Sequence, residues 1–108
     1  MQRRELQQLA LEVLDEMKAE DIAELDVREL TDITDIMMIC TGRSTRHLKS
    51  TAEKLIQAAK AEGHPVLGHA GEEEGEWILV DLGDVIVHIM QTQARDLYQL
   101  ESLWTHAD

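Results

Sequence analysis

The sequence predicts a single domain of the α/β class, of the α+β kind, with a mixed β-sheet flanked by helices. Three observations lead to this fold class. Apolar residues recur at helical spacing near the N-terminus and again around residue 52. The continuous apolar run "IMMICT" (36–41) suits a strand that is buried on both faces. Two apolar segments, 77–82 and 85–90, flank a turn short enough to pair them antiparallel. One core suffices for 108 residues, so the domain is expected to span 1–108.

The first half of the chain predicts a helix, two strands and a second helix. Residues 3–20 have the apolar spacing of an amphipathic helix, and residues 21–27 form a short strand before the buried strand at 36–41. Ser44 is a typical N-cap for the next helix, and Gly63 is typical of the position beyond its C-terminus. The buried stripe of that helix is expected to contain Leu48, Ala52, Leu55, Ile56 and Ala59.

The second half predicts three strands and a last helix. Residues 65–69 form a strand that should run parallel to the buried strand, because a helix connects the two. A solvated loop at 70–76 leads into the antiparallel strands 77–82 and 85–90. Thr92 then caps the last helix, whose apolar side should contain Leu97, Tyr98, Leu100 and Trp104.

Acidic residues dominate the chain and gather toward its C-terminus. The sequence has 22 Asp and Glu against 10 Lys and Arg, a formal net charge of −12. From Glu72 onward, nine acidic residues accompany a single basic one, Arg95, which gives a net charge of −8. Because nucleic-acid binding relies on Lys and Arg, we expect little direct nucleic-acid contact. Such a surface suits a basic protein partner, although an acidic surface also serves solubility.

The sequence also bears on the compartment. No apolar run approaches the ~20 residues that cross a bilayer, and the N-terminal residues lack the apolar core of a signal peptide. The single cysteine, Cys40, excludes an internal disulfide framework and fits a reducing compartment. We therefore expect a cytoplasmic protein with no membrane contact.

Two carboxylates and an imidazole interrupt the most hydrophobic segment, "WILVDLGDVIVHIM" (77–90). Strand alternation places aliphatic side chains alone on one face and a mixture on the other, where Trp77, Asp81 and His88 lie among apolar residues. Asp84 falls at the turn. Three explanations are open at this point: a catalytic or metal site, a satisfied structural network, or a surface that another molecule covers.

A metal or catalytic site has little support in the sequence. A metal ion needs three or four converging ligands, and only Asp81 and His88 are expected to face each other across the hairpin, with Asp84 nearby. The other histidines show no short ligand spacing. Cys40 lies inside an apolar strand, where a buried thiol is inert. We expect no metal and no cofactor.

The segment "CTGRSTRH" (40–47) is a second candidate for binding. A strand that passes through a glycine turn into a helix can hold phosphate on the free N–H groups of the helix, and Arg43 and Arg46 are suitable neighbours. The segment matches neither glycine pattern of the common nucleotide-binding loops. A tight turn with Ser44 as N-cap is therefore favoured over nucleotide binding.

Four segments together resemble the ribosomal silencing factor family, also called the RsfS or Iojap family. They are "DI..LDVRELTDITD" at 21–35, "ICTGRSTRH" at 39–47, "W.LVDLGDVIVHIM" at 77–90 and "R.LY.LE.LW" at 95–104. The last two, in this order and at this spacing, are the most specific. The resemblance covers nearly the whole chain.

The resemblance implies a translational repressor that is not an enzyme. Such a protein binds the large ribosomal subunit through its fourteenth protein, which is basic, and sterically blocks the small subunit when nutrients are short. It also implies a nucleotidyltransferase-like fold and a homodimer in the free state. Two alternatives remain: a degenerate nucleotidyltransferase-like enzyme and an assembly factor of the large subunit. The enzyme is disfavoured because "PVLGHAG" (65–71) lacks the paired acids that hold Mg²⁺ in nucleotidyltransferases.

The resemblance also suggests an answer for the mixed face of the hairpin. A face that combines acids with aromatic residues suits a basic ribosomal protein. The residues expected to bind that protein are Trp77, Asp81, Asp84, His88, Arg95, Tyr98 and Glu101. For Asp84 a purely structural role in the turn, and for Trp104 a role in closing the core, remain open.

Overall fold

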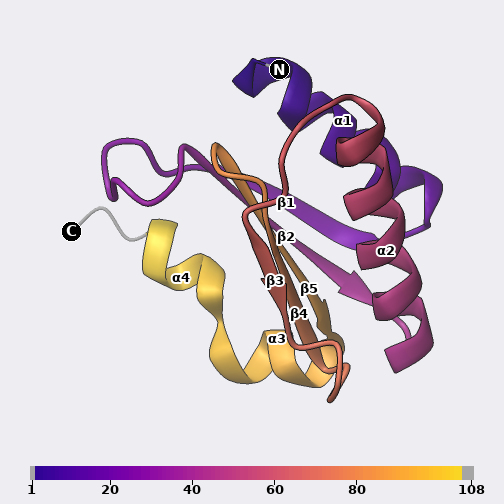
Figure 1. Ribbon diagram of the computed structural model, residues 1–108. Helices are drawn as coiled ribbons and strands as arrows, with labels where there is room; N and C mark the ends of the chain where they lie inside the picture. The colour runs from indigo at the N-terminus through magenta and orange to yellow at the C-terminus, as the bar shows by residue number, and fades with distance from the viewer. Residues whose placement is uncertain (1, 106–108) are drawn as a thin grey trace.

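A single mixed β-sheet organises residues 2–105, the part of the chain that the computed structural model describes. Its strand order is β1-β2-β5-β4-β3. Helices α1 and α2 cover one face of the sheet, and α3 and α4 lie against the other (Figure 1). The mixed α+β architecture predicted from the sequence is confirmed. Along the chain the elements are α1 (Arg3–Glu16), β1 (Glu20–Asp26), β2 (Ile36–Gly42), α2 (Thr45–Ala61), β3 (Gly68–Ala70), β4 (Trp77–Asp81), β5 (Val85–Gln91), α3 (Thr92–Tyr98) and α4 (Leu100–Thr105).

The central strand pair is parallel and joins segments far apart in the sequence. β2 pairs with β5 in parallel, from Ile36 opposite Val85 to Gly42 opposite Gln91. The predicted strand at 65–69 is present as β3, shifted to Gly68–Ala70. β3 runs in the same direction as β2, as expected, but β5 and β4 separate the two. The antiparallel β4–β5 pair lies between them. This strand order depends on long-range pairing, so no local sequence pattern predicts it.

The main core lies between the sheet and the helices α1 and α2. All seven residues of β2 are buried, as its continuous apolar pattern predicted. The aliphatic face of the hairpin also points into this core, with Ile78, Val80, Leu82, Val85, Val87 and Ile89 all buried there. Fully burying one such side chain stabilises the fold by about 1.5–3 kcal/mol. The predicted alternation of the two strands is confirmed.

A smaller apolar cluster occupies the opposite face of the sheet. Its buried members are Val27, Met37, Ile39, Met90 and Ala94, and Leu25, Trp77 and Leu100 pack around them. Of the described helices, the short α3 and α4 lie over this face (Figure 1). Among residues 2–105, Leu97, Tyr98 and Leu103 of these helices remain 75%, 54% and 69% exposed. The described residues therefore cover this face only in part.

The predicted last helix is in fact two helices. Gln99 has φ +46° and ψ +52°, a left-handed conformation that ends α3 and turns the chain into α4. Leu100 packs on the sheet, whereas Leu97 and Tyr98, which were expected on the same apolar side, remain exposed. Thr92 is the first helical residue and Gln91 is the N-cap. The side chain of Trp104 lies outside the described residues.

The other predicted boundaries differ by a few residues. α1 ends at Glu16 and not at residue 20, because Lys18 turns the chain with φ +62°. Lysine rarely takes this conformation, so the sequence held no stop signal. The ends of α2 are as predicted: the Ser44 hydroxyl oxygen accepts the backbone N–H of His47 at 3.1 Å, and Gly63 follows with φ +74°. No helix among residues 2–105 has the length and apolar character to cross a membrane.

Candidate functional site

Three aromatic rings meet on the partly covered face of the sheet. The ring centroids of Trp77 and Tyr98 lie 4.9 Å apart, and those of Trp77 and His88 lie 5.8 Å apart, with tilted planes in both pairs. β4 provides Trp77, β5 provides His88 and the end of α3 provides Tyr98. We call these three residues the aromatic group. Trp77 is half-buried and Tyr98 is exposed, so the group presents ring surface to the outside.

His88 forms a side-chain hydrogen bond with Trp77 on the neighbouring strand. Its Nδ1 accepts the indole N–H of Trp77 at 2.9 Å. Asp81 is opposite Ile86 and His88 is opposite Leu79, so the expectation that Asp81 faces His88 across the hairpin is wrong. The register follows from the tight turn at Leu82–Asp84, where the Leu82 N–H bonds the carbonyl of Val85. His88 is therefore one part of a hydrogen-bonded pair with tryptophan.

Burial determines the charge of His88. The side chain is 6% exposed, and this burial lowers its pKa from 6.5 to about 4. An indole N–H can only donate, so the Nδ1 that accepts it carries no proton. Both observations indicate a neutral imidazole with its proton on Nε2 at neutral pH.

The two aspartates have separate structural roles at the hairpin turn. A carboxylate oxygen of Asp81 accepts the backbone N–H of Gly83 at 2.9 Å, and Gly83 has φ +90°. The backbone carbonyl of Asp84 accepts the N–H groups of Asp35 and Ile36, which fixes the start of β2 beside β5. Asp81 shares its face of β4 with Trp77, whereas Asp84 lies at the end of the hairpin away from the aromatic group. The structure thus does not bring Asp84 together with that group.

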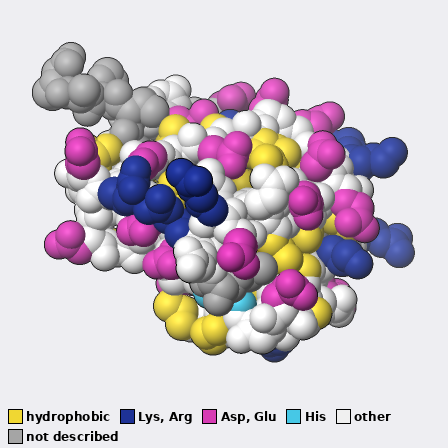
Figure 2. All heavy atoms as spheres, turned by 90° about the horizontal axis from the view of Figure 1, so that it is seen from above, with side chains coloured by type: hydrophobic (Ala, Val, Ile, Leu, Met, Phe, Trp, Pro, Cys, Tyr) yellow, Lys and Arg dark blue, Asp and Glu magenta, His cyan; other side chains and the backbone are white. Residues whose placement is uncertain are grey.

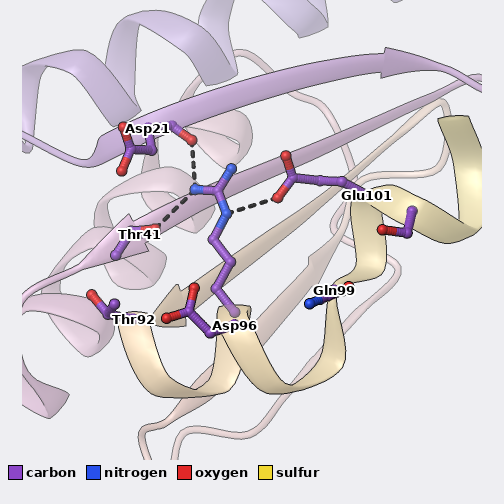
Figure 3. A pocket seen from close by; sticks show the side chains of 8 residues that line it. Asp21, Thr41, Thr92, Asp96, Gln99 and Glu101 are labelled. Atoms are coloured by element: carbon purple, nitrogen blue, oxygen red, sulfur yellow. Dashed lines mark hydrogen bonds and ion pairs between the residues drawn. The ribbon is translucent and has the colours of Figure 1, made fainter.

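Arg95 and Glu101 connect α3 and α4 to the sheet. The Arg95 Nε donates to a carboxylate oxygen of Glu101 at 2.8 Å. Its NH1 group donates to the hydroxyl of Thr41 at 2.8 Å and to the backbone carbonyl of Asp21. In Figure 3, Asp21, Thr41 and Glu101 surround the guanidinium group from three sides, with Asp96 close by. The Arg95 side chain is only 14% exposed, and it lines a hollow of about 390 Å³.

Sequence reasoning missed the partners of Arg95. Asp21 and Thr41 precede Arg95 by 74 and 54 residues, and no spacing rule links them to Arg95. A bulge in β1 between Glu20 and Ala23, where Asp21 has φ +48°, brings the Asp21 carbonyl to the guanidinium group. A left-handed aspartate carries no signal that sequence alone would reveal.

The loop that contains Gly75 packs against the start of α2. The Thr45 hydroxyl at the start of α2 donates to the carbonyl of Gly75 at 3.3 Å, and Gln91 donates to the same carbonyl at 2.8 Å. A Cβ atom on Gly75 would lie 2.2 Å from the Thr45 methyl group, so the loop rests directly on the helix start. The Arg43 side chain bonds the backbone carbonyl of Lys18. Together with the Ser44 cap, these contacts agree with the prediction that the segment is a capped turn.

Cys40 has no nucleophilic character in this fold. It is fully buried, and burial raises the pKa of its thiol to about 12. Thiolate, not thiol, is the reactive form. Among residues 2–105, no three His, Cys, Asp or Glu side chains converge in a way that suits a metal ion.

Acidic side chains are spread over much of the visible surface (Figure 2). Figure 2 shows Asp and Glu spread across the visible face, with Lys and Arg confined to a few separate places and hydrophobic atoms exposed between them. Asp21, Asp96 and Glu101 line the hollow around Arg95, and Asp96 lies on α3, the helix that also carries Tyr98 of the aromatic group. Aromatic surface next to carboxylates is suited to a partner with basic side chains.

Comparison with known proteins identifies the family. The whole chain, residues 1–108, matches the family model described as "Ribosomal silencing factor during starvation". Ribosomal silencing factor RsfS of Haemophilus influenzae is 48% identical over 99 residues, which cover 92% of this chain and 97% of that protein. A Mus musculus protein named mitochondrial assembly of ribosomal large subunit protein 1 is 31% identical over 90% of this chain and 44% of its own length.

The fold agrees with that comparison. A crystal structure of a protein from Chromobacterium violaceum matches with a TM-score of 0.95 at 41% identity, covering 100% of this chain and 90% of that one. Sequence and fold thus agree along the chain, and the resemblance seen in the four sequence segments is confirmed. The chain belongs to the ribosomal silencing factor family.

Proposed function

We propose that this protein represses translation by binding the large ribosomal subunit through its basic fourteenth protein and sterically blocking the small subunit. The observation that carries the proposal is the aromatic group, Trp77, His88 and Tyr98, on a face that its own helices cover only in part. Monomeric proteins rarely leave such a face open unless a partner covers it. The names of the relatives, a silencing factor and a large-subunit assembly protein, support a ribosomal partner.

The proposed contact has an aromatic centre and an acidic periphery. Trp77 and Tyr98 are the anchors, because aromatic side chains supply the largest energies at protein interfaces. Asp81 lies on the same face of β4, and Glu101 lies on α4, where both carboxylates can attract basic side chains. Arg95 contributes by holding α3 and α4 in place. Asp84 contributes at most at the margin, since it lies at the far end of the hairpin.

Charge supports a protein partner over RNA. The chain carries −12 in all and −8 from Glu72 onward, so phosphate groups of RNA would be repelled near the proposed contact. We infer little direct nucleic-acid contact and a cytoplasmic location with the ribosomes. We also infer a regulator without enzymatic activity, because the start of α2 is covered by its own loop and Cys40 is unreactive.

Assembly of the large subunit is the second candidate function. It rests on the mouse relative, which is named for that process. Both functions require binding to the large subunit, but only repression requires that the bound protein prevents subunit joining. Adding the purified protein to mature large and small subunits therefore separates the two.

Sedimentation of ribosomal subunits tests the proposal. We expect the protein to appear with large subunits and to reduce the amount of joined ribosomes. Trp77→Ala and Tyr98→Ala should each weaken binding by about 2 kcal/mol, because each removes an anchor. Leu67→Ala is the matched control, since Leu67 is 65% exposed but lies beside the hairpin turn at Gly83. Folded Trp77→Ala and Tyr98→Ala variants that still bind like the wild type would refute this surface.

A further inference from the structure

The hydrogen bond between Trp77 and His88 uses Nδ1, one of the two ring nitrogens of the imidazole. The indole N–H donates to Nδ1, so the proton of the neutral imidazole is on Nε2. Among residues 2–105, no hydrogen-bond acceptor meets Nε2. In the same part of the chain, no fully buried side-chain nitrogen or oxygen lacks a partner. Nε2 therefore keeps some accessible surface, although His88 as a whole is 6% exposed.

We propose that the Nε2–H of His88 donates a hydrogen bond to a backbone carbonyl oxygen of the ribosomal partner, which makes His88 a specificity-determining residue. The inference rests on the proposed function, because it assigns a role within the same surface. Trp77 fixes which nitrogen carries the proton, so the donor is oriented before the partner arrives. A donor that is already oriented loses little conformational freedom on binding.

The kind of acceptor follows from the charges on both sides. The Lys and Arg side chains of a basic protein have only donors, so they cannot accept from Nε2–H. A carboxylate of the partner would be repelled by the acidic residues of this chain, which has a net charge of −12. Uncharged oxygens of the partner remain as acceptors: backbone carbonyl groups and the side chains of Ser, Thr, Asn and Gln. Of these, the backbone carbonyl is present at every position of a basic surface.

The neutral state of His88 also favours a basic partner. Because burial lowers its pKa to about 4, the imidazole carries no charge at neutral pH. A protonated imidazole beside the anchors would repel the Lys and Arg side chains that Asp81 and Glu101 are proposed to attract. A neutral imidazole can donate a directed hydrogen bond without this repulsion.

Two amide substitutions separate the two nitrogens of the ring. The amide of Asn reaches the position of Nδ1, so His88→Asn can still accept the Trp77 N–H but has no donor at Nε2. The longer amide of Gln reaches the position of Nε2, so His88→Gln keeps a donor there and loses the acceptor for Trp77. We expect His88→Asn to bind purified large subunits about tenfold more weakly, the effect of one lost hydrogen bond. We expect His88→Gln to stay within about threefold of the wild type.

The outcomes of this experiment are distinct. If wild-type protein does not bind large subunits, the proposed function fails. If it binds and His88→Asn binds equally well, or if both variants lose affinity to the same extent, the donor role of Nε2 is refuted while the surface stands. Nitrogen NMR of the wild-type imidazole gives a check that needs no variant. A proton on Nε2 is expected, and a proton on Nδ1 would overturn the inference.

Discussion

His88 shows how one buried side chain can make stability depend on pH. Its imidazole is neutral in the folded protein because burial lowers the pKa to about 4, and Trp77 occupies Nδ1 as a donor. In the unfolded chain the same imidazole titrates near its ordinary pKa of 6.5. Between these two values the unfolded state binds a proton that the folded state does not accept. Protonation therefore favours unfolding in this range.

We predict that the titration of His88 does not change the free energy of unfolding above pH 6.5. As the pH drops from 6.5 toward 4, this titration lowers the free energy of unfolding. The loss should be about 1.4 kcal/mol for each pH unit in this range, because the unfolded chain binds one more proton. Denaturant unfolding at several pH values measures it. His88→Asn is the control, and its difference from wild type isolates this residue from the other histidines. An NMR titration of His88 with a midpoint above pH 6 would contradict the prediction.

At the level of elements, the C-terminal helices depend on contacts with distant strands. α4 has six residues, too short to be stable alone. Gln99 separates it from α3, so the helical hydrogen bonds do not continue between them. Leu100 and the Arg95–Glu101 pair provide the described connections to the rest of the fold. The position of Tyr98, and with it the aromatic group, therefore depends on Arg95.

We predict that Arg95→Lys lowers the free energy of unfolding by about 2 kcal/mol, because lysine cannot reproduce the bonds to Glu101, Thr41 and Asp21 together. Amide hydrogen exchange should accelerate more in 100–105, which opens locally, than in α1 and α2. The matched control is Arg46→Lys, since Arg46 is exposed on α2. Equal effects of the two substitutions would show that the Arg95 network does not hold the C-terminal helices.

At the level of the whole molecule, the partly covered face and the negative charge act in opposite directions. Exposed Leu97, Tyr98 and Leu103 favour association with any apolar surface, including a second copy of the chain. A two-fold pair would cover the same face on both copies. The net charge of −12 opposes such a pair, because both copies carry acidic residues around that face. A weak homodimer in the free state, which the ribosomal partner displaces, is consistent with both effects.

We predict that the free protein forms a weak homodimer that becomes stronger as salt is added, since salt screens the repulsion between two acidic copies. Binding to the basic partner should weaken with salt, because there the charges attract. Light scattering over a range of protein and salt concentrations measures the first effect, and sedimentation with large subunits measures the second. Tyr98→Ala should weaken the dimer, whereas Leu67→Ala should leave it unchanged. A strict monomer at high micromolar concentration, or a dimer that persists on the large subunit, would rule out the shared surface.

The sequence by itself determined the features that arise between neighbouring residues. Strand alternation identified the aliphatic face of β4 and β5, and Ser44 and Gly63 marked the ends of α2. These signals are readable because periodicity and capping act over a few residues. The family, too, was recognised from short segments in a fixed order.

The tertiary structure alone decided which distant groups meet. It placed β5 beside β2 and paired the His88 imidazole with the Trp77 indole and not with Asp81. It brought Asp21 and Thr41 within hydrogen-bond distance of Arg95. It also divided the last helix at Gln99, a residue without a stop signal. Contacts of this kind depend on strand order, register and burial across the whole chain, and a local pattern contains none of these. The charge and tautomer of His88 follow from such contacts, so the chemistry of the proposed surface became visible only with the fold.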